Sequence, residues 1–445
     1  MSSVEPRTRL LRRSVLAAGA TLPLTAPALA AGAGDSSGRN GSAEPDLKAE
    51  LPREDPGSAT AGDPVAQFSA RMLAAIDRAD VNAVCSPLSA QIVLTMIGLG
   101  AAGDTRAQME ETLGGGMDEL AQAANTLTAV LAAVGDEERE DRDDEAPEPA
   151  AVSLVNGLWL QQGMTVRDSY LEDLGRYFGS GVFEADFTDD AEREQARVRI
   201  NDWAAEATQD LIQDLVPQDV LDADSRLVLV NALHLKAAWH KTLSRTTGTF
   251  TTADGSALST ELLSGSTPRW YEDDLCRATA LETYGDDLSL ALVQPTRDLD
   301  TVLDAWSELA DDDRAGLGAL LTGLEASEES TKLTLPGFDI AWDAPLTPVL
   351  DQLGMTEALS EDADLSGITG EEDLFITHVL QKAVITVDDE GMEAAAATAA
   401  AVGTTSVVID EHELVLDSPF LVVAYERSTR APLVLGWIGD PTRTE

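Results

Sequence analysis

The segment SRLVLVNALHLKAAW, Ser225–Trp239, carries four consecutive apolar residues at Leu227–Val230. A continuous apolar run is typical of a strand that is covered on both faces, whereas a strand with one wet face alternates apolar and polar residues. The segment therefore predicts a buried central strand. The helices and strands predicted before and after this segment indicate the fold class and the layers that cover the strand.

The residues before this segment predict mainly helices. Ser86 and Pro87 have the residue types of an N-cap and a first helical position. Thr105 with Gln108 forms a capping-box pattern that opens another helix, which Gly114 closes. Strands are expected at 82–85 and 152–160. Apolar residues at helical spacing predict these further helices: 64–79, 87–98, 117–134 and 193–210.

The residues after the central segment predict mainly strands. The candidates are 288–293, 331–340, 374–387, 413–425 and 431–438. Helices followed by many strands, without regular βαβ alternation and without an internal repeat, favour an α+β fold.

The composition is strongly acidic. The 445 residues carry a net charge of −49, and the acids are spread along the chain. Nucleic acid and anionic membranes are excluded as partners by this charge. A surface of this kind repels itself unless counterions screen it, so we interpret it as adaptation to a saline medium, the alternative being an acidic mesophilic protein. Lysine occurs at five positions: Lys48, Lys236, Lys241, Lys332 and Lys382.

The first 62 residues predict export. Residues 1–30 contain paired arginines, an apolar Ala/Leu run and the small-residue site Ala28-Leu29-Ala30. This pattern resembles a twin-arginine signal peptide, the alternative being a short amphipathic anchor. Residues 31–62, rich in Gly, Ser, Ala, Asp and Pro, predict a flexible linker. We therefore expect an extracellular protein.

A single domain is expected over 63–445. Its acidic stretch 136–150 predicts a disordered, solvated loop. No stretch after the signal is apolar for long enough to span a bilayer. Two cysteines, Cys85 and Cys276, do not make a disulfide framework and have no metal-ligand spacing, so neither a metal nor another cofactor is predicted.

Hydrolase chemistry is disfavoured. The chain contains no G-x-S-x-G and no H-E-x-x-H motif, and the nearest string, Asp410–Glu413, has one histidine only. The protein is therefore not expected to be an enzyme.

Several long strings, in order, resemble the serpin family of serine protease inhibitors over residues 64–441. They are NAVCSPLS with LGAAGDTRAQMEETLG (82–114), INDWAAEATQDLIQDLVP (200–217), SRLVLVNALHLKAAW (225–239) and DSPFLVVAYERSTRAPLVLGWIGDP (417–441). The resemblance implies a serpin fold of three β-sheets and about nine helices, in which a five-stranded sheet accepts one more strand. Leu227–Asn231 and Val379–Val387 would be the neighbouring strands of the insertion slot.

The resemblance implies a reactive loop region at 388–416. By composition alone its alanine run predicts a helix or low complexity. Its position, after one strand and before the closing hairpin, favours the loop instead. Met392 and every second residue after it have small or flexible side chains, which would share one face of an inserted strand. Gly391 allows a hinge. No proline interrupts 392–405, as insertion into a sheet requires. The hinge residues are Glu390, Gly391, Met392, Glu393, Ala394, Ala395, Ala396, Ala397 and Thr398.

The activity implied is suicide inhibition of a serine protease through a covalent complex. The native fold would be metastable, and the mobile loop would insert after cleavage and trap the acyl-enzyme. The family's spacing places the scissile bond between Thr405 and Ser406, where small and β-branched neighbours favour subtilisin-like, elastase-like or chymotrypsin-like targets. The alternative is a non-inhibitory member that acts as a binding or chaperone-like protein. We expect a monomer, with no heparin-like activator, because the helix near 117–134 lacks a basic cluster.

Two residues depart from the family pattern. Met392 replaces a small hydroxyl residue, and Gln381 replaces a histidine that bonds the asparagine matching Asn231 in relatives. The Gln381 amide is able to make an equivalent bond. The residues expected around the slot are Ser86, Ser89, Asn231, Trp239, Gln381 and Lys382, with simple helix capping as the alternative for Ser86.

Overall fold

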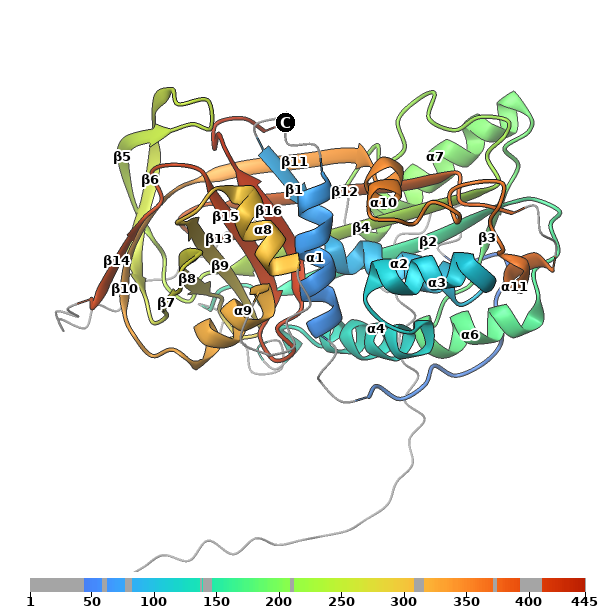
Figure 1. Ribbon diagram of the computed structural model, residues 1–445, viewed down its shortest axis with the longest axis horizontal. Helices are drawn as coiled ribbons and strands as arrows, with labels where there is room; N and C mark the ends of the chain where they lie inside the picture. The colour runs from blue at the N-terminus through green and yellow to red at the C-terminus, as the bar shows by residue number, and fades with distance from the viewer. Residues whose placement is uncertain are drawn as a thin grey trace, which may run out of the picture.

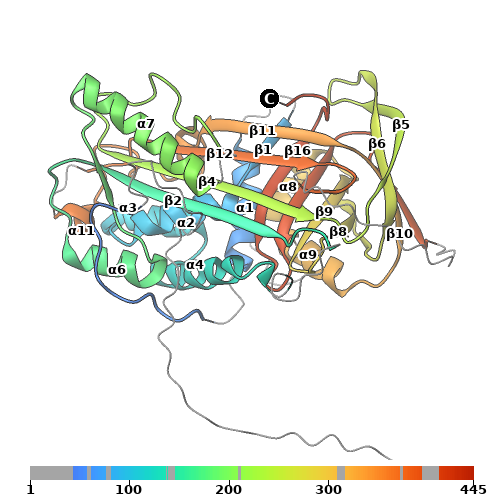
Figure 2. The ribbon, with the colours of Figure 1, turned by 180° about the vertical axis from the view of Figure 1, so that it is seen from behind.

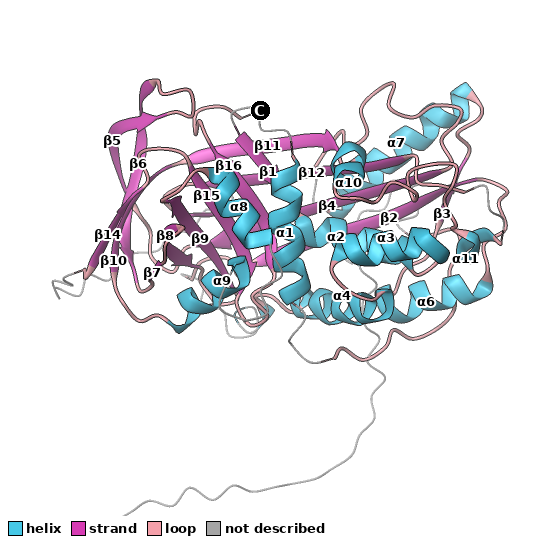
Figure 3. Cartoon of the chain, viewed as in Figure 1, coloured by secondary structure: helices cyan, strands magenta, loops and turns pink. Residues whose placement is uncertain are grey.

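The computed structural model describes residues 44–57, 62–76, 82–136, 138, 146–208, 212–307, 316–370, 374–392 and 410–444. These residues form ten helices and sixteen strands arranged in three sheets, an α+β fold (Figures 1 and 3). The long strands of the largest sheet run along the long axis of the molecule.

The central sheet has the strand order β11-β12-β13-β4-β2-β3. Five of its strands are joined by a sixth of two residues, β13, which lies between β12 and β4. The bounds are β2 Ala151–Gln161, β3 Phe183–Ala185, β4 Leu227–Ala238, β11 Phe338–Pro345, β12 His378–Val387 and β13 Gly391–Met392.

Helices cover both faces of the central sheet, as its apolar run predicts. Helices α2, α4 and α6 lie over one face, in front in Figure 1, and α7 crosses the other, in front in Figure 2. Along β4, Val228 and Val230 contribute to the cluster under α7, whereas Leu229 and Leu233 contribute to the main core. The bounds are α2 Pro87–Gly98, α3 Gly103–Leu113, α4 Met117–Ala132, α6 Asp168–Phe178 and α7 Asp190–Ala207.

The second sheet, in the order β1-β16-β15-β9-β8-β7, contains the C-terminal hairpin and is packed against α1, α8 and α9. Its strands are β1 Asn82–Cys85, β7 Tyr271–Glu272, β8 Cys276–Glu282, β9 Leu288–Pro295, β15 Phe420–Glu426 and β16 Pro432–Ile438. The helices are α1 Asp63–Ala75, α8 Leu299–Ser307 and α9 Gly316–Ala326, with two short helices elsewhere, α10 Thr347–Gln352 and α11 Ser366–Thr369.

The third sheet, in the order β14-β10-β6-β5, forms one end of the molecule (Figure 1). Its strands are β5 Ser244–Thr251, β6 Ala257–Thr267, β10 Thr331–Pro336 and β14 His412–Val415. Two strand predictions were too long, because 331–340 divides into β10 and β11, and 413–425 divides into β14 and β15. Pro336 and Pro419 stand at the two breaks, since proline has no N–H to continue a ladder.

The capping box predicted at Thr105 and Gln108 is wrong. Helix α3 begins earlier, at Gly103, and no side chain caps it. The Thr105 hydroxyl instead donates to the Glu357 carboxylate at 3.1 Å, and the Gln108 carbonyl accepts from the Glu357 N–H at 2.9 Å. Both side chains thus join α3 to a distant segment. The predicted closure at Gly114 is confirmed, since this residue has the left-handed φ of 81°.

The structure differs from the prediction of a free linker over 31–62. Residues 44–57 lie against the domain, with a backbone bridge between Leu47 and Val182. The remaining linker residues except Gly62, the signal segment 1–30, and positions 137 and 139–145 of the acidic stretch are outside the described chain. Composition alone favoured solvation of 44–57, but this short stretch supplies specific hydrogen-bonding partners to the folded surface.

Candidate functional site

Strands β4 and β12 are paired along only part of their length. They run parallel in direct register from Val228↔His378 to Leu233↔Ala383. We call these residues the paired half. Beyond Leu233, along His234–Ala238 of β4 and Val384–Val387 of β12, the described residues contain no direct pairing of the two strands. We call this stretch the hinge half.

Strand β13 lies between the two strands at the far end of the hinge half. Met392 is paired with Val387 of β12 and with Ala237 of β4, and Gly391 is paired with Ala238. Both pairings are antiparallel. The chain therefore enters the central sheet at a position between two strands that are neighbours elsewhere.

A compact turn brings the chain back from β12 into β13. The Asp388 carboxylate accepts from the N–H groups of Glu390 at 2.8 Å and Gly391 at 2.9 Å. The Asp388 N–H donates to the Gly391 carbonyl at 3.1 Å. An aspartate that bonds the backbone two and three residues on is typical of a tight turn, so the sequence Asp-Asp-Glu-Gly itself specifies this reversal.

Two side chains outside the turn hold it in place. The Trp239 indole N–H donates to the Asp388 carbonyl at 2.9 Å, and the Trp239 backbone N–H donates to the Glu390 carbonyl at 2.8 Å. The Asp389 carboxylate forms an ion pair with Arg245 of β5, and the hydrogen bond from this guanidinium lowers the pKa of Asp389. Trp239, which directly follows β4, is buried, and the Asp388 carbonyl is the polar partner that a buried indole N–H needs.

The residues of β13 fit a narrow space. A Cβ atom on Gly391 would lie 2.4 Å from the Ala237 carbonyl oxygen, so glycine is required for this close approach. Met392 is 1% exposed and belongs to the main core, so its own side chain faces inward.

A buried polar network joins the strands in the paired half. The Gln381 side-chain amide donates to the Asn231 side-chain oxygen at 2.7 Å and to the Ser86 carbonyl at 2.8 Å. Its oxygen accepts from the Ser86 N–H at 2.9 Å. Gln381 is 2% exposed and Asn231 is fully buried, so their side-chain amides depend on protein groups as hydrogen-bond partners. The amide makes the bond to Asn231 that the family assigns to a histidine.

The two serines extend this network into the layer beneath. The Ser86 hydroxyl donates to the Leu433 carbonyl at 2.9 Å and does not cap α2, which decides between the two interpretations of this residue. The Ser89 hydroxyl donates to the Asn156 side-chain oxygen at 3.4 Å, and Asn156 is directly opposite Asn231 in the register of β2 and β4. Helix α2 is thereby tied to the central sheet at the point where β4 and β12 meet.

Lys382 does not belong to this network. Its ammonium group points to the surface and donates to the Gln213 carbonyl at 3.3 Å. Residues Glu393–Thr398, Thr405 and Ser406 lie outside the described residues. The sequence interpretation missed Asn156. It placed Asp388 and Asp389 in the loop region 388–416 without a role, which the Asp-Asp-Glu-Gly turn pattern could have supplied.

The described residues include two cysteines and no metal-binding cluster. Cys85 and Cys276 are buried free thiols, and burial raises the pKa of each. Within the described ranges no cluster of three or more His, Cys, Asp or Glu side chains is placed to hold a metal ion. The same part of the chain has no helix with the length and apolar content needed to cross a bilayer.

Comparisons with known proteins agree with the fold. A family model described as "Serpin (serine protease inhibitor)" matches residues 63–441. Alpha-1-antiproteinase 2 from Equus caballus is 30% identical, with 81% of this chain and 82% of the relative covered. Plasminogen activator inhibitor 1 from Neovison vison is 29% identical, with 81% and 88% covered. Serine protease inhibitor from Cyanea capillata is 28% identical, with 82% and 93% covered.

Solved structures show the same architecture. The thermophilic serpin tengpin in its native state gives a TM-score of 0.74 at 20% identity, with 88% of this chain and 97% of tengpin covered. Arabidopsis AtSerpin1 in a native stressed conformation gives a TM-score of 0.72 at 21% identity, with 87% and 100% covered. At these identities the likeness concerns the fold alone.

Proposed function

Because the chain belongs to the serpin (serine protease inhibitor) family, we propose that it inhibits serine proteases as a suicide substrate through insertion of its loop into the central sheet. In this mechanism the protease serine attacks the loop and forms an acyl-enzyme. The loop then inserts before water can release the protease. The inhibitor itself contributes no catalytic residue.

The observation that carries the proposal is the position of β13. Met392 is already paired with both β4 and β12, and Gly391 with β4, at the end of a stretch where the described residues of these two strands are not paired with each other. A strand that continues in the direction of β13 would run antiparallel to both and would pair with their free edges. Each added ladder bond contributes roughly 1 kcal/mol net, and bonds on both edges of the new strand favour extension once cleavage frees one end of the loop.

We assign the scissile bond to Thr405–Ser406 and favour a subtilisin-like target, then elastase-like or chymotrypsin-like proteases. The support is the lack of Arg or Lys near this bond, which disfavours trypsin-like enzymes.

The twin-arginine-type segment and the acidic composition support an exported protein of a saline medium.

Incubation with subtilisin tests the mechanism at fixed, high salt. We expect a complex that survives denaturing electrophoresis and a fragment whose mass places the cut after Thr405. A non-inhibitory binding protein would give cleaved chain without any complex, and that result would overturn the proposal.

The variant Gly391→Val sharpens this experiment. Its side chain would meet the Ala237 carbonyl, so we expect slower insertion and several-fold more cleaved chain per complex formed. Gly318→Ala on α9 is the matched control, since the nearest atom to its Cβ is 3.9 Å away. Equal partition of the two variants between complex and cleaved chain would contradict the role given to β13.

A further inference from the structure

Residues 44–57, which we call the strap, cross the free edge of the central sheet. The backbones of Leu47 and Val182 exchange two hydrogen bonds, of 2.9 and 2.8 Å, immediately before β3. The Asp46 carboxylate accepts from the Glu184 N–H of β3 at 2.8 Å and from the Arg199 guanidinium of α7 at 2.9 Å. This end of the strap therefore joins the edge strand to the helix on one face of the sheet.

The other end of the strap is held by the helices of the opposite face. The Glu54 N–H donates to the Arg176 carbonyl of α6 at 2.8 Å. The Arg53 guanidinium donates to the side-chain oxygen of Asn125 in α4 at 2.6 Å and to its carbonyl at 3.1 Å. Asn125 in turn donates to the Glu54 carbonyl at 3.0 Å. Asn125, which is 3% exposed, thus accepts from Arg53 and donates to Glu54, so it holds two consecutive strap residues.

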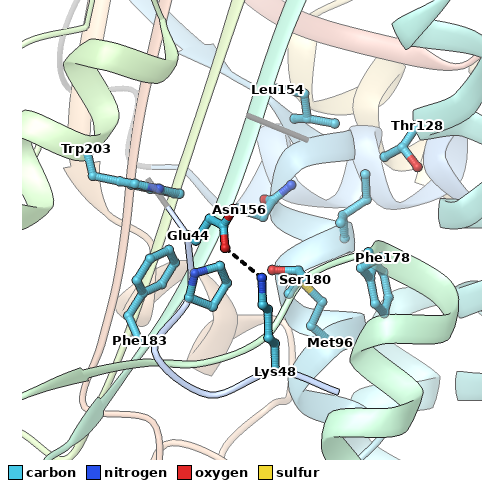
Figure 4. Close-up of a pocket in the computed structure, with 13 residues that line it drawn as sticks. Glu44, Lys48, Met96, Thr128, Leu154, Asn156, Phe178, Ser180, Phe183 and Trp203 are labelled. Carbon is cyan, nitrogen blue, oxygen red and sulfur yellow. Dashed lines mark hydrogen bonds and ion pairs between the residues drawn. The ribbon is translucent and has the colours of Figure 1, made fainter. Parts of the chain in front are cut away.

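A cavity of about 150 Å³ lies beneath the first strap residues (Figure 4). Apolar side chains from α2, α6, β2 and β3 line its walls, and the Glu44–Lys48 ion pair, at 2.6 Å, lies at its mouth. Asn156, one of the lining residues, accepts the hydrogen bond of Ser89 next to the paired half. The strap therefore covers a space that connects the edge of the sheet with the network around Gln381.

The match to the family model begins at residue 63, so the strap lies outside the family domain. It spans α7 on one face and α4 and α6 on the other, and Figure 2 shows it running along α6. Strands β2 and β3 lie on the β4 side of the gap between β4 and β12. Strands β4, β2 and β3 form one continuous ladder, and the strap bonds link its edge strand to α7, α4 and α6.

We propose that the strap is a brace that holds β3 and its flanking helices together and slows separation of β4 from β12. The inference rests on the proposed function for its biological meaning, because slow separation preserves an uninserted loop. The contacts that carry it do not depend on inhibition. Arg53 is a positioning residue, because its guanidinium holds the strap against Asn125 of α4.

The variant Arg53→Ala, made in the full chain, tests the brace. Loss of its charge-assisted hydrogen bonds is expected to raise the rate of spontaneous loss of inhibitory capacity on warming by roughly tenfold. Asp55→Ala is the control, since Asp55 is an exposed strap residue and no contact of its side chain contributes to the brace. Equal rates for the two variants would overturn the proposal.

A disulfide between Leu47→Cys and Val182→Cys gives a second test with the opposite sign. The two residues are antiparallel bridge partners, so their separation suits a disulfide, and the native cysteines are buried free thiols. The oxidised variant is expected to convert several-fold more slowly than the same variant under reduction. No difference between the two redox states would contradict the brace.

Hydrogen exchange separates this proposal from the proposed function. Arg53→Ala should raise amide exchange in the paired half, at Gln381 and its neighbours, whether or not the chain traps a protease. If complexes form normally but exchange is the same as in Asp55→Ala, the brace is wrong and the inhibitory mechanism stands. If no complex forms but exchange rises, the brace stands and the inhibitory mechanism is wrong.

Discussion

The paired half and the hinge half belong to the same two strands but are closed by different means. In the paired half, six residues of β12 are in direct register with β4, and Gln381 bonds both Asn231 and Ser86 beneath the junction. In the hinge half, contact between the strands passes through two residues, Gly391 and Met392. One half is held by a buried polar network and the other by a short inserted segment.

The comparison of the two halves indicates where a strand can enter the central sheet and which hydrogen bonds must break for it to do so. Entry at the hinge half needs no ladder between β4 and β12 to break, because β13 already separates them. Further insertion must break the ladder of the paired half and loosen the bonds of Gln381. Buried hydrogen bonds of this kind are costly to leave unmade, so the network is positioned to set the resistance to sheet opening.

The largest effect is expected from Gln381→Ala, which would break the paired half. The change leaves the Ser86 N–H and the Asn231 side-chain oxygen without a partner in a buried site, whereas the Ser86 carbonyl keeps its bond from the Ala90 N–H. Each unsatisfied group costs about 1–3 kcal/mol, so the free energy of unfolding should fall by about 3 kcal/mol or more. Urea denaturation at fixed salt measures it.

Gln381→His is the comparison variant for this prediction. An imidazole ring offers one donor and one acceptor, or two donors when protonated, and so replaces part of the amide's bonding to Asn231 and Ser86. Its loss of stability should be clearly smaller than that of the alanine variant. A Gln381→Ala protein within about 0.5 kcal/mol of the parent would show that the network does not hold the paired half.

Acid is expected to weaken the hinge half through His234 of β4. Burial, aided by the charge of Lys236, lowers the pKa of His234 to about 4. Because an unfolded histidine titrates near 6.5, the unfolded chain binds the extra proton between these values, and stability is lost as the pH falls from about 6.5 towards about 4. Between neutral pH and about pH 5 the expected loss is about 2 kcal/mol.

Urea midpoints at about pH 7.5 and about pH 5 check this prediction. His234→Gln should remove most of the difference, whereas His240→Gln, at an exposed position, should leave it unchanged. Burial also lowers the pKa of His378 in the paired half, so a smaller acid dependence should persist in the His234 variant. An acid dependence that is the same in both glutamine variants would contradict the assignment to the hinge half.

The smallest effect is expected from Lys382→Ala. This residue neighbours Gln381 in sequence, but its ammonium group reaches the Gln213 carbonyl at the surface. Removal of one exposed hydrogen bond should change the free energy of unfolding by less than about 0.5 kcal/mol. A loss comparable to that of Gln381→Ala would show that the paired half extends to the surface.

The covered central strand and most of the long helices could be predicted from the amino-acid sequence, and the ordered motif strings indicated the fold family. Continuous apolar residues at Leu227–Val230 indicated a strand between two layers, and α2 is buried at every position, as its apolar character required. These features are local, because a periodicity or an apolar run needs no distant partner to be recognised. Gly391 was likewise recognisable from the sequence as a point of conformational freedom, whereas the hinge residues after Met392 lie outside the described chain and stay a prediction.

The tertiary structure alone decided which side chains meet. Thr105 and Gln108 match a cap in sequence but bind the Glu357 segment, and Ser86 bonds the C-terminal hairpin rather than its own helix. Residues 44–57 have the composition of a linker, yet they are ordered by partners in α4, α6, α7 and β3. A polar side chain takes the partner that the folded chain brings within hydrogen-bond reach, and sequence spacing does not encode which distant partner that is.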